Sequence, residues 1–292
     1  MEKGNKYLNE YDKKIVGMLL ELFESLLGLL EKHGFQYWTC GGTTIGAVRH
    51  QGMIPWDDDI DIYMPRADYD RFLNLSKSDL PAGCGIVSTK DKGYFLPFAK
   101  YINTNTSLWE FKEQPFMYGV YIDIFPLDFV NGDKKKILSR KSRCIDDFWR
   151  YQLCLNEKTT LQYLKERHPR TVLFKILYSH RGKEMKYLNR YNDQVRMYSS
   201  ADGLYAISWS QVKGSIFERS WFDEYVTMPF DGLKVRVPKG YDAYLTYRYG
   251  DYMQYPPEEQ RCPAHLHYYI NLKEGLTIDE AKERIRNGEY KV

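Results

Sequence analysis

The sequence predicts an α+β fold in which helices flank a mixed sheet and an additional helical segment is attached. Apolar residues recur at helical spacing from Tyr11 to His33, and Gly34 is a natural residue to end that helix. Aspartates alternate with apolar residues in "DIDIYM" (Asp59–Met64), and "YIDIFPLD" (Tyr121–Asp128) repeats the pattern, which is typical of strands. From Asp133 to about Tyr198 the chain becomes basic, with helical periodicity.

The remaining elements follow in chain order. A short buried strand is expected at "FQYWTC" (Phe35–Cys40), and the pair Gly41–Gly42 breaks it. We expect Thr43 to cap a short helix after this turn, and Pro126 to end the second aspartate strand. Near the C-terminus we expect a short strand in "KVRVP", a helix from about Tyr241 to Tyr249, and a loop rich in tyrosine and proline.

Composition argues against several classes of protein. With 292 residues, 43 % of them hydrophobic and 28 % charged, the chain can bury a sizeable core as one large domain or two small ones. A net charge of +3 is too small to indicate nucleic-acid binding. The five cysteines are scattered and include no C-x-x-C pair, which indicates no disulfide framework or zinc site and fits a reducing cytoplasm. We expect neither a signal peptide nor a membrane span.

Four aspartates occupy the five positions from Asp57 to Asp61. In an extended segment Asp59 and Asp61 point to one side, and the interleaved apolar side chains point to the other. Carboxylates that are forced together repel one another unless a cation neutralises them. With Asp123 supplied by the second strand, the pattern predicts a site for Mg²⁺ or Mn²⁺ that is suited to phosphate chemistry. Asp57 and Asp58 precede the alternation, and we expect them to cap or orient the loop.

An acidic surface turn or a structural calcium loop is the alternative interpretation of these aspartates. It is weaker because they alternate with isoleucine, and because no EF-hand spacing is present. The pair Gly41–Gly42 adds to the phosphate interpretation. Glycines let backbone N–H groups approach a phosphate closely, and the N-terminus of the following helix favours negative charge.

The stretch "CGGTTIGAVRHQGMIPWDDDIDIYM" resembles the LicD family of phosphocholine transferases, which is related to the fukutin group within the nucleotidyltransferase-fold superfamily. The superfamily pattern is a Gly-Gly or Gly-Ser pair, a short helix, Asp-x-Asp on the next strand and a third carboxylate on a later strand. Gly41 and Gly42 match the pair, Asp59 and Asp61 match Asp-x-Asp, and Asp123 takes the third position.

The resemblance implies a nucleotidyltransferase-like mixed sheet and a division of the chain into three parts. Residues 1–130 would form the catalytic core, residues 131–200 a basic helical segment or insertion, and residues 201–292 a segment that completes the active site. The implied reaction is metal-dependent transfer of phosphocholine from CDP-choline to a hydroxyl of a cell-surface glycan precursor, of teichoic-acid or lipopolysaccharide type, with release of CMP. In it Asp59 and Asp61 would hold metal, and Asp123 would complete that shell or act as base.

Several further residues are candidates for substrate binding. The block "YLTYRYGDYMQYPPEEQRCPAH" is similar to the closing block of the family, and isolated basic residues could meet phosphate charge. The candidates are Gly41, Gly42, Thr43, Arg49, Lys100, Arg248, Asp251, Arg261 and His265. A choline donor also predicts an aromatic cage, for which Trp56, Trp109 and Phe111 are candidates by position in the chain, although core packing explains each of them better.

The basic stretch "KKKILSRKSR" (Lys134–Arg143) could face phosphates or anionic lipid, although a solvated helix face is the simpler interpretation. We therefore expect a cytoplasmic enzyme, with peripheral contact at the inner face of the membrane as a hypothesis. Three alternatives remain open: a glycosyltransferase that uses Asp-x-Asp to hold a nucleotide-sugar, a nucleotidyltransferase that moves a nucleotide to a small acceptor, and a non-catalytic binding module. Whether the donor carries choline, ethanolamine, glycerol or ribitol is open. Whether the site binds one metal ion or two is open as well.

Overall fold

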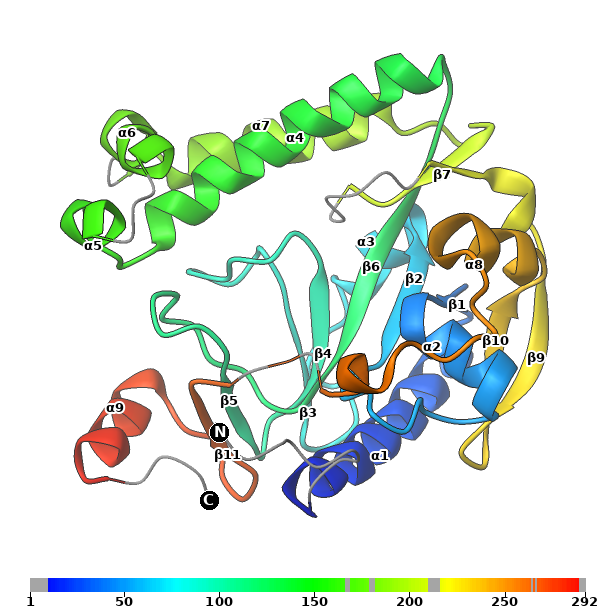
Figure 1. Ribbon diagram of the computed structural model, residues 1–292, viewed down its shortest axis with the longest axis horizontal. Coiled ribbons are helices and arrows are strands. Elements are labelled where there is room, and N and C mark those ends of the chain that lie inside the picture. Colours follow the sequence, from blue (N-terminus) through cyan, green and yellow to red (C-terminus); the bar gives the residue numbers. More distant parts are fainter. Residues whose placement is uncertain are drawn as a thin grey trace.

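The computed structural model describes residues 10–165, 169–178, 182–209, 216–263, 265 and 267–288 (Figure 1). The helices are α1 (Glu10–Lys32), α2 (Gly41–Ile45), α3 (Arg66–Phe72), α4 (Lys134–Leu155), α5 (Thr160–Lys165), α6 (Pro169–Tyr178), α7 (Glu184–Tyr198), α8 (Tyr241–Tyr249) and α9 (Ile278–Arg286), with a π-helical turn at Gly46–His50 and 3₁₀ turns at Arg219–Trp221 and Glu258–Gln260. None of the helices in these ranges is long and apolar enough to cross a membrane.

The strands form one mixed sheet and two small antiparallel pairs. They are β1 (Trp38–Thr39), β2 (Asp61–Pro65), β3 (Cys84–Val87), β4 (Ala99–Asn103), β5 (Ser107–Trp109), β6 (Tyr121–Val130), β7 (Tyr205–Ile207), β8 (Ile216–Glu218), β9 (Tyr225–Phe230), β10 (Leu233–Pro238) and β11 (Tyr269–Asn271). The main sheet has the order β1-β2-β6-β4-β3, and β7 pairs with the far end of β6 and with β8. Strands β2 and β6 are parallel, and the other neighbours are antiparallel. The predicted α+β mixed sheet is confirmed.

Both faces of the sheet are buried, by different parts of the chain. The apolar stripe of α1 covers one face, where Ile60, Ile62 and Ile124 belong to the largest hydrophobic cluster. On the other face Tyr63 and Phe125 pack with aromatic residues from the C-terminal part of the chain. Among these are Phe222, just before β9, and Tyr244 of α8. The N-terminal core and the C-terminal segment are therefore joined across the sheet.

Four local predictions are wrong in detail. Only Trp38 and Thr39 of the predicted strand at 35–40 pair with β2, and Asp59 lies in the loop before that strand. Cys40 rather than Thr43 is the N-cap residue of α2. Strand β6 does not end at Pro126 but continues through it. Pro126 lies between the residues of β6 that pair with β4 and those that pair with β7, so its missing N–H costs no hydrogen bond on that side.

The predicted helical segment is present as α4 to α7. Asp133 caps α4 by accepting hydrogen bonds from two backbone N–H groups, and α4 and α7 pack side by side (Figure 1). The basic stretch at the start of α4 does not form one solvated face. Lys134 pairs with Glu218 at 2.8 Å, and Lys141 is buried.

Candidate active site

Three charged side chains lie in a row across the central strands of the sheet. Asp61 on β2 is in register with Asp123 on β6, and Asp123 is opposite Lys100 on β4. Side chains at paired positions point to the same face of a sheet, so all three belong to the face that carries Tyr63. Lys100 Nζ donates to Asp123 Oδ1 at 2.7 Å, and both side chains are buried. The sheet thus brings together two of the predicted catalytic aspartates and one predicted binding residue.

The turn at the glycine pair holds Asp61 in place. The backbone N–H of Asp61 donates to Thr43 Oγ1 at 2.8 Å, and its carbonyl accepts from the Cys40 N–H at 3.1 Å. Thr43 therefore fixes the strand, which explains why its hydroxyl does not cap α2. A binding role for Thr43 stays a prediction.

The two glycines leave room for carboxylates. A Cβ on Gly41 would lie 3.5 Å from Asp61 Oδ2, and one on Gly42 would lie 2.6 Å from Asp57 Oδ2. Gly41 also has φ +56°, a conformation that side chains rarely adopt. Its N–H donates to Tyr244 Oη at 3.0 Å, so this amide already has a partner. In this structure the pair gives space to the acids, and phosphate contact by its amides stays a prediction.

Burial and mutual repulsion raise the pKa values of the clustered carboxyls. Burial, with the charge and the hydrogen bond of Asp59, raises the pKa of Asp57 to about 8. Burial and the charges of Asp59 and Asp123 raise the pKa of Asp61 well above its usual value. Burial raises the pKa of Asp123 to about 6, although Lys100 opposes this shift. A divalent cation would relieve the repulsion and return these groups to the ionised form.

The donor atoms of the site fit a hard divalent cation. Asp61 Oδ1 is buried and accepts no hydrogen bond within the described part of the chain, although buried polar atoms normally have a partner. Among the described residues, Asp58, Asp59 and His265 also form a group whose potential ligand atoms all lie within 4.8 Å of one another. Carboxylate oxygens are the preferred ligands of Mg²⁺ and Mn²⁺. The assignment of metal to Asp59, Asp61 and Asp123 remains a prediction.

His265 is attached to the acidic loop by Asp58. Its backbone N–H donates to Asp58 Oδ2 at 3.1 Å, its Nδ1 lies 3.0 Å from Asp58 Oδ1, and its Nε2 lies 3.9 Å from Asp59 Oδ2. Burial disfavours the charged ring, but the hydrogen bond to Asp58 and the charge of Asp59 outweigh this effect and raise the pKa of His265 to about 9. The loop residue Asp58 therefore anchors the C-terminal segment, as the expected orienting role suggests.

Arg248 reaches the same neighbourhood from α8. Its Nη1 donates to Tyr63 Oη at 3.2 Å, and its guanidinium lies 5.3 Å from the ring centre of Tyr249. The Tyr249 hydroxyl and Asp61 Oδ2 lie 3.4 Å and 3.5 Å from the point that a Gly41 Cβ would occupy. The last turn of α8 is therefore adjacent to the carboxylate row.

The other predicted basic residues form a separate cluster. Arg49 Nη1 donates to the carbonyls of Tyr252 and Gln254 at 2.6 and 3.0 Å, and its guanidinium lies 4.7 Å from the ring centre of Tyr255. Arg261 lies over the same ring at 5.3 Å and over Trp56 at 5.5 Å. Asp251 is exposed in the turn after α8.

The predicted choline cage of Trp56, Trp109 and Phe111 does not form. Trp56 packs against Tyr255 and Arg261. Trp109 is buried beside β11, and its indole N–H donates to the carbonyls of Phe111 and Gln114. These positions are separated because sequence proximity does not determine which element covers each ring.

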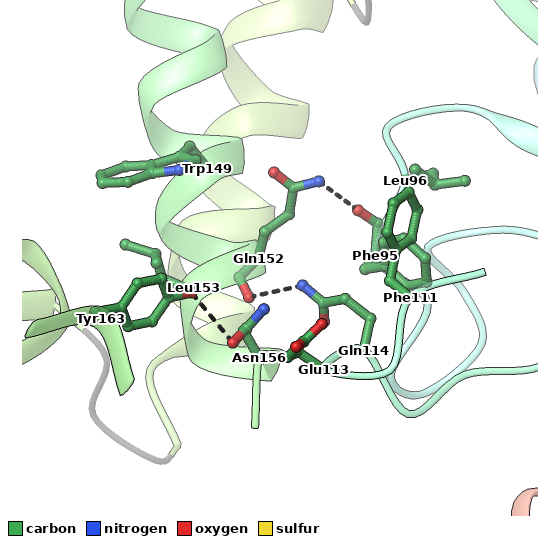
Figure 2. A pocket seen from close by; sticks show the side chains of 10 residues that line it. All are labelled: Phe95, Leu96, Phe111, Glu113, Gln114, Trp149, Gln152, Leu153, Asn156 and Tyr163. Atoms are coloured by element: carbon green, nitrogen blue, oxygen red, sulfur yellow. Dashed lines mark hydrogen bonds between the residues drawn. The ribbon is translucent and has the colours of Figure 1, made fainter. Parts of the chain in front are cut away.

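Phe111 instead lines a pocket of about 310 Å³ between the last turns of α4 and the loops that carry Phe95 and Phe111 (Figure 2). The lining residues are Phe95, Leu96, Phe111, Glu113, Gln114, Trp149, Gln152, Leu153, Asn156 and Tyr163. Figure 2 shows Trp149 and Tyr163 on one side of Gln152 and the two phenylalanines on the other. None of the candidate catalytic aspartates lines this pocket.

Residues that the sequence did not indicate surround Lys100. Its Nζ lies 3.2 Å from the ring centre of Tyr121 and 5.0 Å from that of Tyr118. Both tyrosine hydroxyls donate to Glu110. The lysine that pairs with Asp123 therefore also lies over two aromatic rings, and no local motif signals this arrangement.

A mixed sheet with aspartates in register on adjacent parallel strands, preceded by a glycine turn, defines a nucleotidyltransferase-like enzyme. Residues 34–150 match the family described as LicD/FKTN/FKRP, nucleotidyltransferase domain. The chain is 30 % identical over 253 residues to the lipopolysaccharide cholinephosphotransferase LicD of Haemophilus influenzae, which covers 85 % of this chain and 93 % of that protein. The chain therefore belongs to the LicD family and is a transferase of this type.

A shorter similarity extends to animal proteins. Ribitol 5-phosphate transferase FKRP from Homo sapiens and from Mus musculus is 46 % identical over 44 residues, which covers 15 % of this chain and 9 % of each relative. The family resemblance predicted from the glycine pair and the aspartates is confirmed.

Proposed function

We propose that the protein transfers phosphocholine from CDP-choline to a hydroxyl of a cell-surface glycan precursor, of lipopolysaccharide or teichoic-acid type, and releases CMP. The observation that carries this proposal is the buried row of Asp61 and Asp123 beside the acidic loop. Support for the choline group comes from the similarity over most of the chain to a lipopolysaccharide cholinephosphotransferase. We propose Mg²⁺ or Mn²⁺ as the cofactor, because the clustered carboxyls need a cation to ionise together.

In this proposal Asp59 and Asp61 hold the metal, which when bound neutralises phosphate charge and stabilises the leaving group. Lys100 occupies one oxygen of Asp123 and fixes that side chain, so the second oxygen holds metal or accepts the proton of the acceptor hydroxyl. With a pKa of about 6, Asp123 is ionised at neutral pH and is suited to accept a proton. His265 stays charged there and supplies a positive group beside Asp59.

Other groups could take the place of choline or of the whole donor. The 44-residue match to a ribitol 5-phosphate transferase favours ribitol phosphate as the second candidate for the transferred group. That match spans only a small part of both chains, so the similarity over 253 residues carries more weight.

A thermal shift experiment tests the donor. With Mg²⁺ present, CDP-choline is expected to raise the melting temperature more than CDP-ribitol, CTP or a UDP-sugar, because a ligand that binds only the folded state stabilises it. The Asp59→Ala protein should lose this response. Preferential stabilisation by CTP or the UDP-sugar would replace the proposal by nucleotidyl or glycosyl transfer, and preference for CDP-ribitol would replace choline by ribitol.

We also propose that the enzyme works at the inner face of the membrane, through an apolar surface on α5 and α6. Five aliphatic side chains there are each more than half exposed: Leu161, Leu164, Leu173, Ile176 and Leu177. These two helices lie at one end of the α4–α7 pair, away from the sheet (Figure 1). Exposed Lys165, Lys183 and Lys186 belong to the same part of the chain, which suits an anionic lipid surface.

Vesicle flotation tests this location. The wild-type protein is expected to float with vesicles that contain anionic lipid and to bind less to neutral vesicles. Leu173→Ser combined with Ile176→Ser should reduce flotation, whereas Leu138→Ser, an exposed leucine on α4, should not. Equal flotation of all three proteins would remove α5 and α6 as the contact.

A further inference from the structure

Lys141 is a buried cation for which the described part of the chain provides no acceptor. Its side chain is 2 % exposed, and Nζ makes no hydrogen bond. Lysine is rarely fully buried without a partner, because an unpaired ammonium loses its hydration without compensation. A methionine at this position would fill the same space at lower cost. Lys141 therefore calls for a partner that the described residues do not supply.

The charge that acts on Lys141 is of its own sign. Burial and the positive charge of Arg248 lower the pKa of Lys141 to about 8. Lys141 belongs to α4 and Arg248 to α8, so the two charges come from helices far apart in the sequence. Two like charges placed together in a partly dehydrated region repel each other, and an anion between them would turn this repulsion into attraction.

A second unsatisfied donor lies at the same interface. Trp209, just after β7, is 1 % exposed, and its indole N–H has no acceptor within the described residues. Trp209 packs in one cluster with Ile137 and Cys144, which lie about one helical turn on either side of Lys141. An indole N–H can only donate, so Trp209 lacks an acceptor, as Lys141 does, among these residues.

The cation pair is connected to the carboxylate row through α8. Arg248 contacts Tyr63 and Tyr249, and the Tyr249 hydroxyl lies beside Gly41, next to Asp61 Oδ2. Arg248 therefore lies beside the acidic group of β2, and its charge also acts on Lys141 of α4. A ligand with a metal-binding end and a second anionic group would match this distribution of charge.

We propose that Lys141 and Arg248 form a binding site for a phosphate group of one of the two substrates, beside the carboxylate row. The choice of phosphate rests on the proposed function, in which the donor carries a diphosphate and the glycan precursor can carry a phosphate. The ammonium and the guanidinium donate to the phosphate oxygens, and such charge-assisted hydrogen bonds are among the stronger ones in proteins. Lys141 is a binding residue in this proposal.

The test begins with phosphate binding to the metal-free protein, measured by isothermal titration calorimetry with inorganic phosphate. Lys141→Met keeps the length of the side chain and removes its charge. Its affinity for phosphate is expected to fall at least about 10-fold, the value of one hydrogen bond to a charged group. Lys136→Met, an exposed lysine on the same helix, should bind phosphate like the wild type. Lys141→Met should also resist urea better than the wild type, because an unpaired buried charge is gone.

Steady-state kinetics then identifies the source of the phosphate. A higher KM for the donor in Lys141→Met assigns the site to the donor diphosphate, and a higher KM for the acceptor assigns it to the glycan precursor. Equal phosphate affinity in the wild type and Lys141→Met, or no phosphate binding by the wild type, overturns the proposal. If Lys141→Met does not fold, the same titration with Arg248→Gln decides. The titration measures phosphate binding without turnover. Its result can therefore be interpreted even if CDP-choline is not the donor.

Discussion

The two faces of the central sheet differ in chemistry, although the same strands supply both. Ile60, Ile62 and Ile124 point toward α1 into the largest hydrophobic cluster. Asp61 and Asp123, which alternate with them, point to the opposite face, where burial raises their pKa values. The apolar face lowers the free energy of the folded state, whereas the acidic face holds charges that the fold alone does not neutralise. The period of two in a strand lets one short segment serve both purposes.

The largest expected effect is on the acidic face. Asp61→Asn should reduce the rate of transfer at least about 10³-fold, because a bound metal contributes several kcal/mol to transition-state stabilisation. The free energy of unfolding should stay the same or rise, since one repelling carboxylate is gone. Rates from ³¹P NMR and unfolding in urea measure the two quantities. Asp279→Asn, which removes an exposed carboxylate on α9, is the control. A rate for Asp61→Asn within tenfold of the wild type would contradict the assignment of Asp61.

The next effect belongs to the apolar face. Ile62→Ala should lower the free energy of unfolding by about 2–5 kcal/mol, the usual result of removing a fully buried aliphatic side chain. The folded protein should keep the wild-type KM for the donor, as measured at a temperature well below melting. Leu138→Ala, at a position 44 % exposed, should change stability little. A large change in donor KM for Ile62→Ala with no loss of stability would show that the apolar face acts in donor binding rather than in stability.

A smaller, pH-dependent effect is expected at the edge of the acidic face. The pKa of His265 is about 9 in the folded protein and about 6.5 when unfolded. Its raised value therefore stabilises the metal-free protein fully below pH 6.5, and this stabilisation is lost as the pH rises through 9. His265→Asn should be less stable by roughly 1–3 kcal/mol at pH 6 and equally stable near pH 10. Urea unfolding across this range is the measurement; a constant difference would indicate packing rather than charge.

The last effect is the response to metal. Saturating Mg²⁺ should raise the melting temperature of the wild type by a few degrees, because a ligand at 100 times its Kd adds about 2.7 kcal/mol. Ile62→Ala should melt lower but show a similar increment, whereas Asp61→Asn should show little or none. Chelation should reverse the shift. An equal response in all three proteins would mean that the metal binds elsewhere.

The sequence predicts the parts of this site that lie within single strands. Alternation around Asp61 and Asp123 places both on one face, and the glycine pair identifies the turn that makes room for them. Contacts between distant segments carry no such signal: Asp58 and His265 are separated by 207 positions. Lys141 looks like part of a solvated basic run, and only the packing of α4 shows that it is buried. The failed aromatic cage has the same origin, because tertiary packing decides where each ring lies.

Strand β6 has a further consequence for the whole molecule. Its first half pairs with β4 and carries Asp123, and its second half pairs with β7, with Val130 opposite Tyr205. The chain therefore leaves the sheet for α4 to α7 and returns at the same place. Because both ends of this segment are held by paired strands, its outer helices α5 and α6 can differ in length and surface while the catalytic strand keeps its register. A change in those outer helices would therefore leave the positions of Asp61 and Asp123 in the sheet as they are.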